Sequence, residues 1–174
     1  MKKLLLLIVA TSMILAACSE DKKETTTETK TSETPKTETK SDTTIDLMKF
    51  YLSISKSINE TDADLNAFEG AEELPEGTEL QTMKDAAKTS ADNTIAQIQS
   101  LEVPETLSEQ QEKIDSALTK IEEAYTMKSE ALAAEGEVVF DEANAKFEEA
   151  DAELNALLEE AELAPSSILN EVSK

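Results

Sequence analysis

The chain has 174 residues, with 38 acidic residues against 16 basic ones, no histidine and a formal net charge of −22. Every basic residue is a lysine. This composition excludes Ser-His-Asp and Cys-His catalytic sites and histidine-based zinc sites. It also argues against nucleic-acid binding, because such an acidic chain has no basic patch to neutralise phosphates.

Residues 1–17 have the pattern of an export signal. Lys2 and Lys3 give a short positive start, and the fourteen residues from Leu4 to Ala17 are nearly all apolar. A helix that spans a bilayer needs about 20 apolar residues, so this run is short for a permanent span. Its length, its positive start and the small residues at its end are typical of a cleaved signal peptide.

The run ends in Leu15-Ala16-Ala17-Cys18, which contains the only cysteine of the chain. These four residues resemble the lipobox of bacterial lipoproteins, in which an aliphatic residue and two small residues precede a cysteine. The resemblance implies that Cys18 receives a diacylglyceryl group and becomes the first residue after cleavage. Two acyl chains hold a protein stably on a membrane, whereas one holds it weakly. The alternative is an ordinary secretory signal; we expect lipidation, at the extracytoplasmic face of the bacterial cell membrane.

Residues 18–44 are predicted to be a disordered tether. After Cys18 the segment contains only Ser, Glu, Asp, Lys, Thr and one proline, and Thr27-Glu28-Thr29-Lys30 recurs as Thr37-Glu38-Thr39-Lys40. Such a segment buries too little apolar surface to offset the entropy lost on ordering. As a flexible coil its ends would lie about 25–30 Å apart, which would hold the next domain away from the membrane.

The acidity is concentrated in residues 45–174. Loss of Lys2 and Lys3 with the signal changes the net charge from −22 to −24, and the seven acids and five lysines of residues 19–44 account for only −2 of it. The other −22 lies on residues 45–174. Such a field favours cationic partners and repels nucleic acid and anionic lipid.

Residues 45–174 are predicted to be an acidic helical domain. Apolar residues at spacings of three and four predict a first helix over residues 44–68, with Asp42 or Thr43 as its N-cap. Its stripe consists of Leu47, Tyr51, Ile54, Ile58, Thr61, Leu65 and Phe68, of which only Thr61 is polar. After a loop at residues 70–77, a second helix begins at Thr78, where Thr78 and Gln81 have the spacing of a capping box. Its apolar face consists of Leu80, Met83, Ala87, Ala91, Ile95, Ile98 and Leu101.

Two further long helices and a short one follow. Pro104 is expected in the first turn of the third helix, which Gly136 ends. The face of this third helix consists of Leu107, Gln111, Ile114, Leu118, Ile121, Tyr125 and Leu132. Lys128 lies on the same face, so its ammonium group is expected to reach outward to solvent. The fourth helix presents Phe140, Ala143, Phe147, Ala150, Leu154, Leu157 and Ala161 and ends before Pro165. Ser166 or Ser167 would cap the last helix, which carries Ile168, Leu169 and Val172.

All three glycines, and every proline except Pro35, lie between these helices, in agreement with the periodicity. Short connections make neighbouring helices antiparallel. We therefore predict an all-α fold: an antiparallel up-down four-helix bundle with a short C-terminal fifth helix, preceded by a signal peptide and a disordered tether. This architecture, the lysine-only basic residues and Val103-Pro104-Glu105 resemble the uncharacterised helical-bundle lipoproteins of Gram-positive bacteria. The resemblance implies no functional residue.

One candidate metal site needs to be weighed. Asp62, Asp64, Asn66 and Glu73 occupy positions 1, 3, 5 and 12 of an EF-hand-like loop, but the glycine required at position 6 is replaced by Ala67. The alternative is the acidic end of the first helix, which we favour, so we expect no metal site. We likewise read Tyr51, Tyr125 and the methionines as core side chains and not as ligand contacts.

The sequence therefore predicts a membrane-anchored lipoprotein that is not an enzyme, needs no cofactor and acts as an interaction module for an unidentified partner. Cys18 is the only residue with an assigned role, as the lipidation site. Besides the membrane, the expected partners are a cationic protein or peptide, or a cell-wall component. The alternative function is an immunity-type lipoprotein that sequesters a cationic peptide at the membrane surface.

Overall fold

The computed structural model describes residues 37–172, and throughout them the regular structure is helical, without strands. Its elements are α1 (Thr37–Asn59), α2 (Ala63–Glu69), α3 (Thr78–Gln99), the 3-10 turn η1 (Glu105–Leu107), α4 (Gln111–Ala133), α5 (Asp141–Glu160) and α6 (Ile168–Val172). These residues all belong to one compact unit, residues 35–174. The predicted signal peptide, Cys18 and residues 18–36 of the predicted tether lie outside the described residues.

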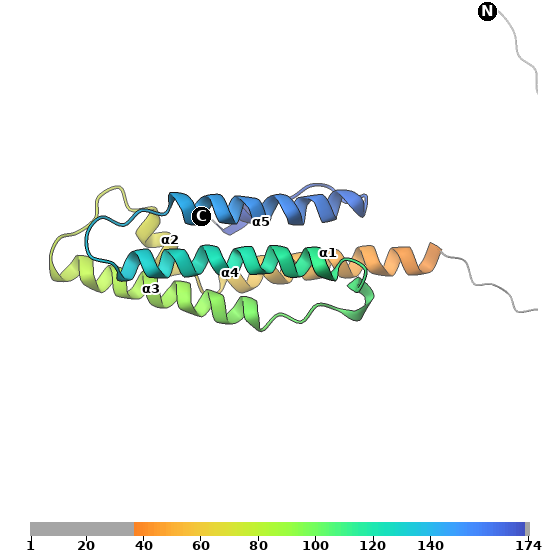
Figure 1. The fold of residues 1–174 in the computed structure, drawn as a ribbon, viewed down its shortest axis with the longest axis horizontal. Helices are drawn as coiled ribbons and strands as arrows, with labels where there is room; N and C mark the ends of the chain where they lie inside the picture. The colour runs from red at the N-terminus through yellow and green to blue at the C-terminus, as the bar shows by residue number, and fades with distance from the viewer. Residues whose placement is uncertain (1–36, 173–174) are drawn as a thin grey trace, which may run out of the picture. The chain divides into compact units, whose positions relative to one another are not determined.

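The long helices pack lengthwise on one another (Figure 1). The largest contacts join α4 to α5 and α3 to α4, and α2 packs on α3. Helix α1 contacts α3, η1 and α6, and it makes a smaller contact with α5. The C-terminal α6 also contacts α5, so the short helix lies against two of the long ones.

The core follows the predicted apolar stripes. On the first stripe every apolar residue is buried, from Leu47 to Phe68, and on α4 the predicted face is buried from Ile114 to Leu132. The last helix buries Ile168 and Val172 as expected. Alanines at Ala87, Ala91, Ala117, Ala124 and Ala150 are fully buried. Small side chains at these positions allow the helix axes to approach closely, which suits long, straight packing.

The prediction of one helix over residues 44–68 is wrong, because the chain breaks between α1 and α2. In a continuous helix the Leu65 amide would donate to the Thr61 carbonyl oxygen. Here the hydroxyl of Ser90 on α3 takes the place of that bond. It donates to the Thr61 carbonyl oxygen at 2.6 Å and accepts from the Leu65 amide at 3.3 Å. Insertion of a side chain into the helical ladder is a known cause of such breaks.

The break occurs at the one polar position of the first stripe. The hydroxyl of Thr61 lies 2.9 Å from that of Thr94 on α3, and it also donates to the Ser57 carbonyl oxygen at 2.9 Å. Because the chain turns here, the half-buried hydroxyl of Thr61 meets a polar partner in place of an apolar surface.

Several predicted helix ends also differ. Helix α1 begins at Thr37, within the predicted tether and before Asp42 and Thr43, so neither residue caps it. The N-cap of helix α3 is Gly77, and no side chain caps this end. The side-chain amide of Gln81 donates to the Asp85 carboxylate at 2.8 Å, so no capping box forms. By contrast, Ser167 caps α6, because its hydroxyl accepts from the Asn170 amide at 3.3 Å.

The third predicted helix begins later than expected. Pro104 has an extended backbone and precedes η1, and α4 begins at Gln111. Leu107 is fully buried and reaches the core from this 3-10 turn, while Thr106 donates to Asp46 of α1 at 2.9 Å. These contacts with α1 fix a turn where local propensity alone would continue a helix.

Candidate functional site

The structure places the predicted site residues apart from one another. Cys18 lies outside the described residues. Of the EF-hand-like set, Asp62 is buried, the Asn66 amide donates to the Val172 carbonyl oxygen at 2.8 Å, and Asp64 and Glu73 are exposed. Their oxygens do not converge on a common point, since residues 63–69 form a helix and not a loop. Within residues 37–172, no group of three or more Asp, Glu, Cys or His side chains is placed to hold a metal ion.

A buried polar cluster lies at the break between α1 and α2. Asp62 is 1% exposed, and its Oδ2 accepts a hydrogen bond from the Tyr125 hydroxyl of α4 at 3.3 Å. The other oxygen, Oδ1, has no hydrogen-bond partner. Burial raises the pKa of Asp62 above its ordinary value, and the neighbouring Asn66 and Tyr125 side chains only partly oppose this effect. Burial and the Asp62 carboxyl raise the pKa of Tyr125 well above its ordinary value.

Lys128 belongs to the same region, and the expectation that its ammonium group reaches solvent is wrong. Its Nζ donates to Glu69 Oε1 of α2 at 2.6 Å and lies 5.7 Å and 5.6 Å from the ring centres of Tyr125 and Phe140. The residue is 8% exposed, and the Glu69 carboxylate and the rings of Tyr125 and Phe140 surround its ammonium group. Aromatic faces and a carboxylate together replace the water that a lysine loses on burial.

These interior groups are suited to a structural role. Asp62 and Tyr125 are 1% and 3% exposed, so both side chains are packed in the interior. The Tyr125 ring packs edge-on against Phe147 of α5 at 6.0 Å between ring centres, which places it in the core. Its hydroxyl points into the interior and not to the edge of the helices, as its contact with Asp62 requires.

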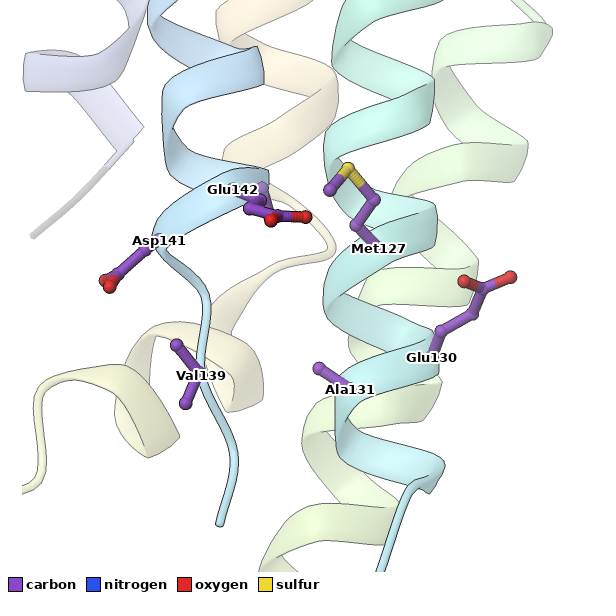
Figure 2. A pocket seen from close by; sticks show the side chains of 7 residues that line it. Met127, Glu130, Ala131, Val139, Asp141 and Glu142 are labelled. Atoms are coloured by element: carbon purple, nitrogen blue, oxygen red, sulfur yellow. The ribbon is translucent and has the colours of Figure 1, made fainter.

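The surface is hollowed where α4 meets the start of α5, and Figure 2 shows this groove. The groove has a volume of about 490 Å³ and is lined by apolar Met127, Ala131, Val139 and Ala143 and by acidic Glu130, Asp141 and Glu142. In Figure 2, Met127 and Glu142 point toward each other across the space between the two helices, Ala131 faces the same gap, and Val139 lies on the segment across it, at the edge. Val139 is 58% exposed, the highest exposure among the large apolar side chains in the part of the chain that the structure describes.

A second hollow of about 320 Å³ lies next to the first along α4. It shares Met127 and is otherwise lined by Thr119, Glu122, Glu123 and Thr126. The two hollows together form what we call the acidic groove. Glu122 accepts from Gln99 of α3 at 3.0 Å, and Glu123 lies 3.5 Å from Lys146.

Sequence patterns alone hardly indicate this groove. The sequence predicts that Met127, like the other methionines, is a core side chain. The usable signal was the isolated apolar Val139 among the acidic residues Glu137, Asp141 and Glu142. The role of Val139 depends on which face of α4 lies across from it, and only the tertiary structure shows that face.

Within residues 37–172, no helix combines the length and the apolar character that crossing a membrane requires. Comparison of the chain with protein-family models, with curated proteins and with solved structures gave no match in any of the three searches.

Proposed function

We propose that this protein is a membrane-anchored extracytoplasmic lipoprotein whose helical domain is a non-enzymatic interaction module. The observation that carries the proposal is Leu15-Ala16-Ala17-Cys18 at the end of a short apolar run. A diacylglyceryl group on Cys18 supplies two acyl chains, enough for stable anchoring. Residues 18–36 then form the tether, and the helical domain follows from Thr37.

We further propose that the domain is an up-down four-helix bundle with α6 as a short fifth helix. Figure 1 supports this arrangement, since α1, α3, α4 and α5 alternate in direction along the chain. The connections from α3 to α4 and from α4 to α5 join neighbouring helices that pack lengthwise. A bundle of this kind presents long, rigid helix faces to a partner.

Metabolic labelling with a palmitate analogue tests the anchor. The wild-type chain is expected to incorporate label and to fractionate with membranes, and Cys18→Ser is expected to lose the label. Mass spectrometry of the mature N-terminus should find a lipidated Cys18 as the first residue. Unlabelled wild-type protein, released into the medium after cleavage, would show that the segment is an ordinary secretory signal.

A second candidate function is sequestration of a cationic peptide at the membrane surface, as in immunity-type lipoproteins. The charge of −22 on residues 45–174 and the acidic groove favour it. The competing explanation is that the charge only keeps the domain soluble. A strain lacking the gene is expected to become more sensitive to cationic peptides; unchanged sensitivity would remove this candidate.

A further inference from the structure

We infer that the acidic groove binds a cationic amphipathic helix of a partner protein or peptide. This inference rests on the proposed function as an interaction module, because it names the surface and the class of partner. The relevant features are the hollow, its apolar floor, its charge and its length along α4.

The floor of the groove is apolar, with Met127 and Ala131 partly exposed and Ala143 buried. Met127, Ala131 and Ala143 line it, and Val139 stands at its edge with 58% exposure. A volume of about 490 Å³ is within the range of sites that hold a ligand side chain or small molecule. Methionine adapts its shape to different apolar groups, and therefore suits a surface that accepts a side chain from outside.

The titratable side chains that line the groove are all acidic. They are Glu122, Glu123, Glu130, Asp141 and Glu142. The cation beside them, Lys146, is shared between Glu123 at 3.5 Å and Glu149 at 3.6 Å, so it offsets one charge at one end. Glu130 lies on one side of the gap and Asp141 and Glu142 on the other (Figure 2). Charge complementarity therefore requires a positively charged partner.

The length of the groove fits a helix. Its α4 residues, from Thr119 to Ala131, recur at spacings of three and four and so follow one face of α4. At 1.5 Å per residue this face extends about 18 Å, which is roughly three helical turns. An amphipathic helix laid along it would place apolar anchors on Met127 and Val139 and lysines or arginines beside the carboxylates.

The same charge argues against other occupants. A second copy of this chain carries the same net charge of −22 and would be repelled. An anionic lipid surface or a nucleic acid would be repelled for the same reason. The partner is thus both cationic and apolar on one side, and either property alone is insufficient.

Binding of a synthetic leucine-lysine amphipathic helix to the full chain in mild detergent tests the inference. The groove variant Glu130→Gln/Asp141→Asn/Glu142→Gln is compared with the control Glu102→Gln/Glu109→Gln/Glu112→Gln. Both remove three exposed carboxylates, so the net charge and the partition of peptide into detergent are matched. We expect the groove variant to bind about tenfold more weakly than wild type, and the control to change by less than about twofold.

The apolar contacts of the groove with the peptide are tested by the same binding measurement. Val139→Asn is expected to weaken binding by about threefold or more, whereas Leu52→Asn, at a residue 53% exposed on α1, is expected to leave it unchanged. A peptide in which glutamate replaces lysine should not bind. Equal losses in the groove and control variants would overturn the inference, because they would mean attraction to overall charge alone.

The outcomes separate this inference from the proposed function. If wild-type protein is lipidated at Cys18 but does not bind the leucine-lysine helix, the groove inference fails and the anchor stands. If the peptide binds at the groove while Cys18 carries no lipid, the anchor fails and the groove stands.

Discussion

Asp62 shows how one residue is shaped by its surroundings. It is a carboxyl group with 1% exposure, one oxygen bonded to Tyr125 and the other without a partner. Burial raises its pKa, because the ionised form loses the hydration that it has in the unfolded chain. The free energy of unfolding therefore depends on pH through Asp62. The contribution of its neutral form is fully present below the pKa that Asp62 has in the unfolded chain, and it is lost as pH rises through the higher pKa that Asp62 has in the folded chain.

Asp62→Asn is therefore expected to stabilise the protein in a pH-dependent way. At pH 7 the free energy of unfolding of the variant should exceed that of wild type by about 1 kcal/mol, because the buried charge is gone. Below the ordinary aspartate pKa of 3.8 the gain should disappear, since wild-type Asp62 is then neutral in both states. Urea unfolding at several pH values measures this.

Asp64→Asn, at the exposed neighbouring carboxylate, is the control and should show no such pH dependence. A gain for Asp62→Asn of the same size at pH 3 and pH 7 would mean that its carboxyl group does not titrate differently in the fold.

At the scale of elements, the break between α1 and α2 depends on α3. Ser90 is buried and its hydroxyl satisfies the Thr61 carbonyl oxygen and the Leu65 amide, which a continuous helix would have joined to each other. The break lets α2 pack on α3 and brings Glu69 to Lys128. One hydroxyl from a neighbouring helix thus satisfies two backbone groups that the break leaves without a helical partner.

Ser90→Ala is expected to lower the free energy of unfolding by about 1–3 kcal/mol, because two buried backbone groups lose their partner. Amide hydrogen exchange should show loss of protection at Leu65. Thr89→Ala, at an exposed hydroxyl that bonds only within α3, should change stability by less than about 0.5 kcal/mol. Unchanged exchange at Leu65 in Ser90→Ala would contradict the assigned bond.

At the scale of the whole molecule, charge is the dominant property. Residues 45–174 carry a net charge of −22, so repulsion among like charges acts throughout the domain. Surface pairs such as Lys113–Glu160 at 2.5 Å and Lys88–Asp92 at 2.6 Å reduce this only locally. Exposed pairs contribute little individually, so the net effect of charge on stability is unfavourable.

We therefore expect the thermal midpoint of unfolding to rise with salt. Between about 0.01 M and 0.15 M salt the Debye length falls from about 30 Å to about 8 Å, which screens the long-range repulsion. The midpoint should rise by roughly 5 °C, and equally in NaCl and KCl, because screening does not depend on which cation is used. A midpoint that falls with salt would show that the ion pairs outweigh the repulsion.

The helical character, the buried face of most helices and the regions between them can be predicted from the sequence. These features depend on the spacing of apolar residues and on Gly and Pro, which act within a few residues of their position. Leu47, Ile54, Ile114 and Ile168 are accordingly buried as predicted.

The break at Thr61, the burial of Lys128, the start of α4 and the acidic groove could not be predicted, because they depend on tertiary contacts. Each depends on a partner far along the chain: Ser90 lies 29 residues from Thr61, and Glu69 lies 59 residues from Lys128. A polar side chain is buried where another element supplies its missing hydrogen bond, and periodicity within one helix carries no record of that element. The groove likewise depends on tertiary structure, because Val139 and Met127 line it together. Sequence patterns place these two residues in separate segments.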